Sequence, residues 1–492
     1  MSRHKPKQVK ALSSWARRQY KNVSKLGRNK LLIFVLGFAV IASLLLIATH
    51  ASAPTVSVEP ESGSSTLNSP AVKGTDTTAS GGGYVKFQSL GGGVTASKGV
   101  YVADFFNAPI TDLAKDPQIN YINGFVQAYK WSVIEPSNGS YDWTHKDSNG
   151  KNDENLDADI QAAYAAHKKI GLAIDTGAFT PAWADPQFLT FIISSHNGAG
   201  PNGAKCQSIN VPIPWDSTYQ ANLHSMIQAL TSHLKATRAS TDPNDSTTLY
   251  DVVSQVKLTG ITEDTEETRM PSEAGNPAIS GTPDPGIQCT SGVNVGGYVT
   301  DAPSTWKAAG YTRSKAEQAW KTMAGYWAAA FSDKTLGHPT IATAAFPNID
   351  DSGTIQYNKD GTYKSDTQTT HDLINFSNST WGKQYMLMQQ ALSNCSNEPT
   401  TSYGITYAAQ NRLQIGVGFQ LQAITYGNAA PDPKNIPSIT GAVSVGINGT
   451  TAGVNGCTVT SAPYHMTYLE IFSNVPTADP AGTINAYTLL NL

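Results

Sequence analysis

Apolar stretches of strand length recur along the chain from residue 98 onward, and longer stretches with helical periodicity separate them. Leu223, Met226, Ile227 and Leu230, for example, repeat every three to four residues, which is the spacing of one helix face. Repeated alternation of strands and helices predicts a parallel sheet. The expected strands are residues 99–106, 122–129, 169–175, 252–259, 340–346, 413–419 and 467–472, and the expected helices are residues 156–166, 219–236, 314–331 and 369–393.

Seven strands in the part of the chain from residue 98 to residue 492 fit a (β/α)8 TIM barrel in which one strand is not recognised. We expect that strand at residues 402–409 or 439–445. A doubly wound open α/β sheet is the alternative. No Gly-rich phosphate-binding loop follows the first expected strand, which weighs against a nucleotide-binding fold.

The N-terminal 49 residues have a different pattern. Ten of the 34 Lys and Arg residues lie within residues 1–30, before the first acidic residue, Glu59. Residues 31–49 follow at once and carry no charge, and a run of roughly 18 or more apolar residues is long enough to cross a bilayer. Because positive flanks stay in the cytoplasm, we expect a basic cytoplasmic arm (1–30), a single transmembrane signal-anchor helix (31–49) and an exported C-terminal part. A basic arm in this position sets membrane topology, so we expect no nucleic-acid partner.

The small residues Ala51–Ala53 leave a cleaved signal peptide open as the alternative to a retained anchor. The protein is therefore expected in the cell membrane with its C-terminal domain outside, or secreted if it is cleaved near Ala53. Residues 50–97 are rich in Ser, Thr and Gly and are expected to be an extracytoplasmic linker. Within it, residues 79–87 resemble the opening strands of β-jelly-roll carbohydrate-binding modules, but the segment is too short to close a sandwich.

Composition agrees with an exported protein. Charged residues make up only 14% of the 492 residues, and all four cysteines lie beyond the apolar run. An even number of cysteines in an oxidising compartment predicts disulfides. We expect the pairs Cys206–Cys289 and Cys395–Cys457, with buried free thiols as the alternative.

Two segments carry acidic side chains at the ends of expected strands. In the last strand, Glu470 shares one face with Tyr468 and Phe472, while the apolar residues of the other face are expected to pack against helices. A carboxylate inside a barrel is costly unless it is paired, so Glu470 is either catalytic or part of a structural salt bridge. The second segment contains Glu263, Asp264, Glu266 and Glu267 and follows the strand at residues 252–259.

These two segments together predict glycosidic cleavage, which needs one carboxyl group to donate a proton and another to stabilise or attack the sugar cation. Crowding of like charges raises the pKa of one carboxyl group, as a proton donor requires. We expect Glu266 to be the general acid/base, with Glu267 and then Glu263 as the alternatives. A solvated acidic loop is the competing interpretation of this segment.

Other residues at the expected strand ends would line the same bowl, because active sites of such barrels lie at the C-terminal ends of the strands. Aromatic rings there are natural platforms for the C–H faces of sugars. The scattered histidines and serines show neither ligand spacing nor a nucleophile elbow, so we expect no metal and no cofactor. The expected substrate-binding residues are Asp104, Tyr129, Trp131, Asp175, Trp183, Glu263 and Gln420.

Three motifs resemble clan A glycoside hydrolases. They are Trp131–Trp143 (WSVIEPSNGSYDW), Thr180–Trp183 (TPAW) and Val211–Tyr219 (VPIPWDSTY). The resemblance covers roughly residues 98–475. It implies a (β/α)8 barrel and retaining hydrolysis, with an acid/base Glu after the fourth strand and a nucleophile Glu on a late strand. By position these are Glu266 or Glu267, and Glu470, which lies on the seventh or the eighth strand.

We therefore expect residues 98–492 to form a catalytic domain that hydrolyses O-glycosidic bonds of an oligo- or polysaccharide outside the cell, by a double displacement that uses two glutamates. The alternative is a non-catalytic carbohydrate-binding or cell-surface adhesion protein on a degenerate barrel. The sequence leaves open which sugar and linkage are cut and whether the attack is endo or exo.

Overall fold

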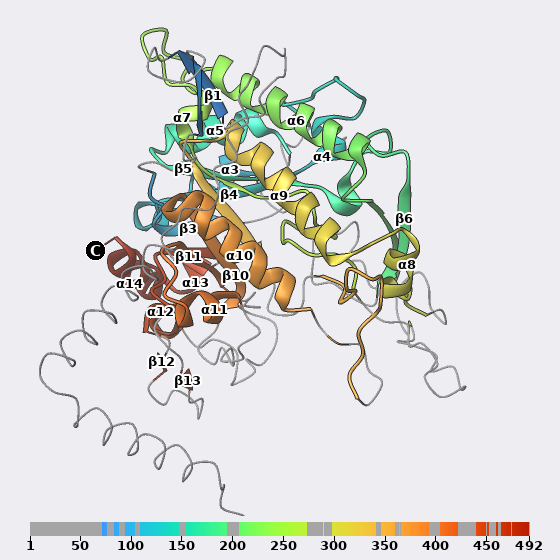
Figure 1. Ribbon diagram of the computed structural model, residues 1–492. Coiled ribbons are helices and arrows are strands. Elements are labelled where there is room, and N and C mark those ends of the chain that lie inside the picture. Colours follow the sequence, from blue (N-terminus) through green and yellow to red (C-terminus); the bar gives the residue numbers. More distant parts are fainter. Residues whose placement is uncertain are drawn as a thin grey trace, which may run out of the picture. The chain divides into compact units, whose positions relative to one another are not determined.

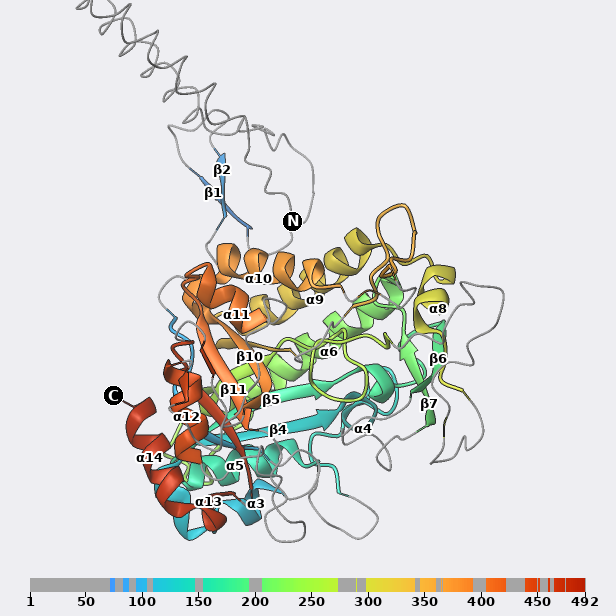
Figure 2. The same ribbon diagram turned by 90° about the horizontal axis from the view of Figure 1, so that it is seen from below.

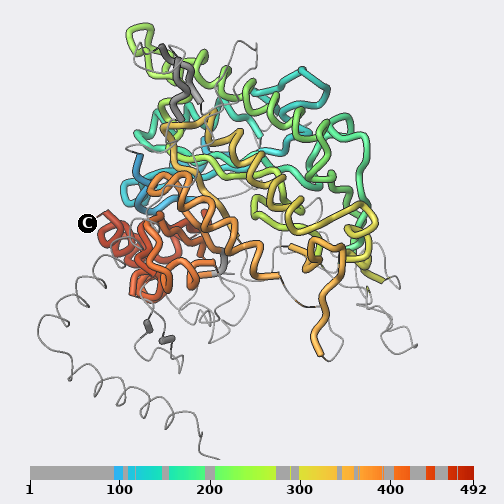
Figure 3. The backbone as a smooth tube through the Cα atoms, in the orientation of Figure 1, coloured from blue at the N-terminus to red at the C-terminus, as the bar shows by residue number. Residues whose placement is uncertain are grey.

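The computed structural model describes residues 71–75, 83–87, 94–103, 109–146, 154–193, 206–272, 289, 298–340, 346–359, 364, 366–392, 404–421, 439–448, 450–451, 459–460, 464–473 and 475–491. Eight parallel strands close into a barrel, with hydrogen bonds between each strand and the next and between the last and the first. In chain order they are β3 (Gly99–Ala103), β4 (Gly124–Lys130), β5 (Lys169–Asp175), β8 (Val253–Lys257), β9 (Thr335–Thr340), β10 (Tyr385–Leu392), β11 (Gly416–Leu421) and β14 (Tyr468–Phe472). Figure 3 shows the blue start of the barrel beside its red end, where β3 and β14 pair.

Helices between the strands cover the outside of the barrel, and α6, α9 and α10 follow one another along one side (Figures 1 and 2). Shorter elements follow the ends of several strands, and β6 pairs antiparallel with β7 after β5. The main helices are α5 (Leu156–Ala165), α6 (Ser217–Ala236), α9 (Arg313–Ala330), α10 (Gln368–Trp381), α11 (Gly404–Gln410), α12 (Ile439–Asn448) and α14 (Pro480–Leu490). The shorter elements include α3 (Ile110–Leu113), α4 (Trp131–Ile134), β6 (Phe188–Ile193), β7 (Gln207–Pro212), α7 (Leu249–Val252), α8 (Ala302–Ala308) and α13 (Val475–Ala478).

The two faces of the barrel wall have separate cores. The large core lies between strands and helices and takes alternate strand residues, such as Leu172 and Ile174 of β5. A small second core lies inside the barrel and contains Tyr101, Val126 and Tyr468. The rings of Tyr101 and Tyr468 pack 4.7 Å apart. The inner face is therefore filled near the N-terminal ends of the strands, and its polar residues gather toward the C-terminal ends.

The closed barrel confirms the predicted fold class over the open-sheet alternative, with two corrections. The unrecognised strand is β10, inside the helix that we expected at residues 369–393, while residues 404–410 and 439–448 are helices α11 and α12. The fifth strand begins at Thr335 rather than at residue 340. Glu470 lies on the eighth strand.

Outside the barrel, β1 (Ala71–Thr75) and β2 (Gly83–Phe87) form a separate two-stranded sheet within the predicted linker, and β12 (Thr450–Thr451) and β13 (Val459–Thr460) form another. The predicted pair Cys206–Cys289 is confirmed, with Cα atoms 5.5 Å apart, whereas the pair Cys395–Cys457 lies outside the described residues. So do the basic arm and the predicted span at residues 31–49. Within the described residues, no helix combines the length and the apolar character of a membrane span.

Helix α5 carries a buried acid whose protonation should be visible in the stability of the fold. Burial raises the pKa of Asp159, and two hydrogen bonds lower it, one from the backbone N–H of Ile110 (2.8 Å) and one from the Tyr129 hydroxyl (3.1 Å). Burial has the larger effect, so the pKa of Asp159 is about 7. The unfolded chain binds this proton with a pKa near 3.9. The native state therefore gains stability from Asp159 that is complete below about pH 4 and is lost as the pH rises through about 7.

We expect Asp159→Asn to flatten the dependence of the free energy of unfolding on pH between about pH 4 and pH 7. Urea unfolding of both proteins across this range measures the effect, with exposed Asp112, changed to Asn, as the control. Parallel profiles for the wild type and Asp159→Asn would contradict the assignment.

Candidate active site

Glu470 points into the barrel. On β14, Leu469 and Ile471 belong to the outer core and Tyr468 to the inner one, so strand alternation places Glu470 on the inner face, where it is fully buried. The Tyr468 hydroxyl donates to Glu470 Oε1 (2.9 Å), and Gln420 Nε2 of the neighbouring strand β11 lies 3.4 Å from Oε2. Burial raises the pKa of Glu470, and Lys257 opposes that rise.

A lysine joins Glu470 to the acidic segment. Lys257, at the end of β8, places Nζ 3.0 Å from Glu470 Oε2 and 3.2 Å from Glu266 Oε1. Burial alone would lower the pKa of Lys257, but Glu470 and Glu266 raise it above its ordinary value. Because both oxygens lie this close to one nitrogen, they are at most about 6 Å apart, a bound that includes the ~5–5.5 Å of retaining glycosidases.

Lys257 is not among the residues predicted from the sequence. The available signal was its place at the end of a buried strand, on the same strand face as Gln255. Gln255 also joins the network, since its side-chain amide donates to the Tyr468 hydroxyl. The barrel interior thus holds a continuous polar network that runs from Gln255 through Tyr468 and Glu470 to Lys257 and Glu266.

The acidic segment after β8 is buried, which rules out the solvated loop. Its four carboxylates, on Glu263, Asp264, Glu266 and Glu267, are each at most 4% exposed. Aromatic side chains from the surrounding helices donate hydrogen bonds on both sides of its acidic residues. These bonds run from Tyr219 to Gly260 O (2.7 Å), from Trp327 to Thr259 O (3.0 Å), from Trp320 to Thr268 Oγ1 (3.4 Å) and from Trp306 to Pro271 O (2.8 Å).

The three glutamates of the segment differ in their contacts. Glu263 accepts a 2.6 Å hydrogen bond from Arg269 Nε in an ion pair, and Glu266 bonds Lys257. Glu267 accepts from the Thr265 hydroxyl, and burial and then the charge of Glu266 raise its pKa well above the ordinary value. Of the three, Glu266 is therefore the one that faces Glu470 across Lys257.

Asp175 ends β5 on the inner face of the barrel, because Leu172 and Ile174 of this strand belong to the outer core. It is fully buried, and neither of its carboxylate oxygens has a hydrogen-bond partner among the residues that the structure describes. Burial raises the pKa of Asp175 well above its usual range, Glu266 raises it further, and Lys257 opposes the rise.

The predicted aromatic platforms are placed differently. Tyr129 points outward to Asp159 of α5, and Trp131 is fully buried, with Nε1 2.7 Å from Glu135 Oε2, so neither lines the inner face. Trp183 is partly exposed and packs edge-on against Trp131 with ring centroids 6.0 Å apart. Trp131 and Trp183 thus both contact the turn around Glu135, while Asp104 lies outside the described residues.

A glycine after β5 allows the acidic segment to approach. Gly177 has φ +56°, and a Cβ there would stand 2.2 Å from Glu263 O and 2.3 Å from Thr262 O. Gly139 also has a positive φ (+73°), but nothing lies within 4 Å of its would-be Cβ. Both alanine variants bear the left-handed backbone strain of about 1–2 kcal/mol, and only Gly177→Ala adds an overlap with backbone atoms.

We expect Gly177→Ala to lower the free energy of unfolding clearly more than Gly139→Ala and to displace the acidic segment. Chemical unfolding measures the first effect, and the near-ultraviolet circular dichroism of the tryptophans that hold the segment reports the second. Equal losses of unfolding free energy in the two variants would contradict this expectation, because they would show that the acidic segment can move away from the added Cβ at no cost.

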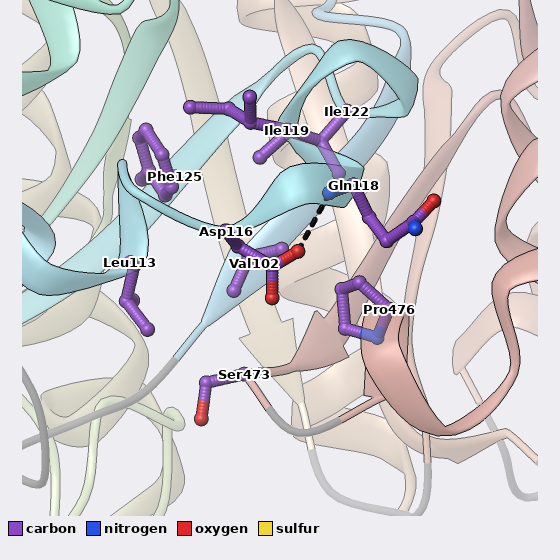
Figure 4. A pocket seen from close by; sticks show the side chains of 9 residues that line it. All are labelled: Val102, Leu113, Asp116, Gln118, Ile119, Ile122, Phe125, Ser473 and Pro476. Atoms are coloured by element: carbon purple, nitrogen blue, oxygen red, sulfur yellow. Dashed lines mark hydrogen bonds between the residues drawn. The ribbon is translucent and has the colours of Figure 1, made fainter.

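A small pocket elsewhere in the molecule does not suit a sugar. It lies outside the barrel wall between β3, β4 and the segment after β14, and Val102, Ile119, Phe125 and Pro476 are among its mostly apolar lining residues (Figure 4). The cavity volume that the centre of a water molecule can occupy is about 10 Å³, which is room for roughly one water. Across the described residues, no group of three or more His, Cys, Asp or Glu side chains is arranged to hold a metal ion.

No protein-family model and no curated protein matches the chain. Among solved structures, the catalytic domain of β-amylase from Paenibacillus polymyxa is similar at 11% identity and a TM-score of 0.42, covering 81% of this chain and 98% of that one. A cellotetraose complex of an endocellulase from Pyrococcus horikoshii (11%, TM-score 0.36, 79% and 91%) and a family 1 β-glucosidase from Thermotoga maritima (9%, TM-score 0.34, 81% and 99%) are similar too. At such identities and scores these likenesses say nothing about chemistry, which depends on the residues described above.

Proposed function

We propose that the barrel is a glycoside hydrolase that cleaves oligo- or polysaccharides with retention of configuration. One observation carries the proposal: two buried glutamates from strands far apart in the chain, Glu266 and Glu470, contact the same Lys257 ammonium from the inner face of the barrel. The bound of about 6 Å between their nearest oxygens lies below the ~6.5–9.5 Å of inverting enzymes, which need room for a water between the carboxyl groups.

In this proposal Glu470 is the nucleophile. Its carboxylate attacks the anomeric carbon while Glu266 protonates the leaving oxygen, and a glycosyl ester forms on Glu470. Glu266 then takes a proton from water, which attacks the ester and releases the sugar. Lys257 and Tyr468 supply the positive charge and the hydrogen bond that keep Glu470 ionised in a site where burial raises its pKa.

The same proposal places the enzyme outside the cytoplasm. The order of a basic arm, an uncharged apolar run and a domain with a disulfide supports export. Cleavage near Ala53 would release the domain, and retention of residues 31–49 would leave it anchored.

A non-catalytic sugar-binding barrel is the second candidate, and the strand order favours it. Glu470 lies on the eighth strand, and the seventh, β11, carries an amide at the same level, Gln420, in register with Glu470. If the seventh strand is where the nucleophile belongs, Gln420→Glu is the variant that should gain turnover, and the wild type should have none.

A panel of chromogenic glycosides tests the proposal, with Glu470→Ala as the control. We expect the wild type to release chromophore from at least one glycoside and the variant to release none above background. Proton NMR of the first-formed sugar should show the anomer of the substrate. Turnover by Gln420→Glu alone, or a first product of the opposite configuration, would overturn the assignment.

A further inference from the structure

The mouth of the barrel has more buried acids than buried bases. On the described residues at the ends of β5, β8 and β14, six carboxyl groups are at most 4% exposed, and two cations face them, one buried and one with a side chain that is 12% exposed. The nearby Lys130 is in register with Asp175, but its ammonium is paired with Glu154 at 2.5 Å. The acids are Asp175, Glu263, Asp264, Glu266, Glu267 and Glu470, and the cations are Lys257 and Arg269.

The excess of carboxyl groups over cations is uncompensated at Asp175. It is fully buried on the inner face, it is close enough to Glu266 for their charges to repel, and neither oxygen has a hydrogen-bond partner among the described residues. Buried polar groups are nearly always paired, and an unpaired carboxylate in a low-dielectric site is costly. A donor that arrives with a positive charge would satisfy both the missing hydrogen bonds and the missing charge.

We propose that this site takes glycans that carry free, protonated amino groups, with the ammonium of a hexosamine residue placed between Asp175 and Glu266. This inference rests on the proposed function in taking the ligand to be a glycan. Protonation of Asp175 and Glu267 alone would still leave four acids facing two cations. A uronic acid, by contrast, would bring a further negative charge into the site and is excluded by repulsion.

Binding of an ammonium has a second consequence, for the proton of Asp175. Burial and Glu266 hold the pKa of this carboxyl group well above its usual range, so the free protein holds this proton more tightly than an ordinary carboxyl group does. A cation next to the carboxyl group lowers that pKa, and the proton leaves as the ligand binds. Neutral sugars have no charge with which to displace it.

Calorimetry of the full chain with three sulfur-linked tetrasaccharides, which resist hydrolysis, tests the inference. The ligands are β-1,4-linked glucosamine, N-acetylglucosamine and glucose, titrated near pH 6 in two buffers of different ionisation enthalpy. We expect the glucosamine ligand to bind at least about tenfold more tightly than either neutral ligand and to release a proton. Asp175→Asn should remove both the preference and the proton release, and exposed Asp112, changed to Asn, should keep both.

Equal or weaker binding of the glucosamine ligand, unchanged behaviour of Asp175→Asn, or no binding of any of the three ligands would overturn the inference. The outcome is separate from that of the proposed function. Turnover of neutral glycosides without a preference for amines leaves the hydrolase proposal standing and ends this one. Selective binding of the amine ligand without turnover of any glycoside supports this inference and ends the hydrolase proposal.

Discussion

Glu470→Gln should lower kcat on the best glycoside by about 10³-fold or more while the fold is retained, because it removes the attacking carboxylate and keeps the shape of the side chain. The loss should be the same for good and poor leaving groups, since formation of the ester fails in each case. Glu266→Gln should differ. It should cost about 10²–10⁴-fold on leaving groups that need a proton and much less on those that do not.

Steady-state kinetics on a series of aryl glycosides of graded leaving-group pKa measures the contrast between the two variants. Glu317→Gln, in a helix-surface pair with Lys321, is the matched control and should leave kcat unchanged. A nearly active Glu470→Gln would remove Glu470 from the mechanism. A leaving-group dependence in Glu470→Gln instead of Glu266→Gln would exchange the two roles.

Lys257→Met should be the most destabilising single change, at about 3–5 kcal/mol, because it leaves Glu266 and Glu470 buried without their shared cation. Against a total stability of about 5–15 kcal/mol this is a large fraction. Without the lysine, its opposition to the effect of burial is lost, so the pKa of Glu470 in the folded state rises further above the unfolded value near 4.3. The variant should therefore be relatively stable below about pH 4.3 and lose stability as the pH rises through the raised folded-state pKa of Glu470.

Denaturant unfolding of Lys257→Met across this pH range measures the effect. Lys115→Met, at an exposed surface pair with Asp112, should leave the free energy of unfolding nearly unchanged. Adding Glu470→Gln to Lys257→Met should recover part of the loss, because one of the two unpaired charges is gone. A loss that is independent of pH and not relieved by Glu470→Gln would mean that Lys257 acts through packing alone.

The strand that sequence patterns missed shows where local preference misleads. Residues 385–392 are rich in Met, Leu, Gln and Ala, which favour helices, and they follow a true helix, α10, after the short 3-10 turn Gly382–Gln384. The usable signal was Gly382, which ends α10 with φ +51°. Pairing on both sides with β9 and β11 then overrides the helix preference. The fifth strand was placed late because Gly337 and Pro339 look like loop residues.

Strand alternation explains where the predicted site residues lie. Glu470 and Asp175 sit on the inner face because the apolar residues that alternate with them must face the helices. Tyr129 lies one residue before the end of β4, and this single step turns it to the outer face. Whether Trp131 and Trp183 face a sugar or a neighbouring turn depends on tertiary contacts, which no spacing in the sequence reveals. The sharing of Lys257 by two distant carboxylates depends in the same way on closure of the barrel.

We propose above that Glu470 forms a covalent bond to the sugar. The most direct test of this proposal is mass spectrometry of the protein after reaction with the 2-deoxy-2-fluoro analogue of its best glycoside, whose ester intermediate hydrolyses slowly. We predict one sugar per chain, attached to the peptide that contains Glu470. A label on any other residue, or a turning-over enzyme that acquires no label, would contradict the account.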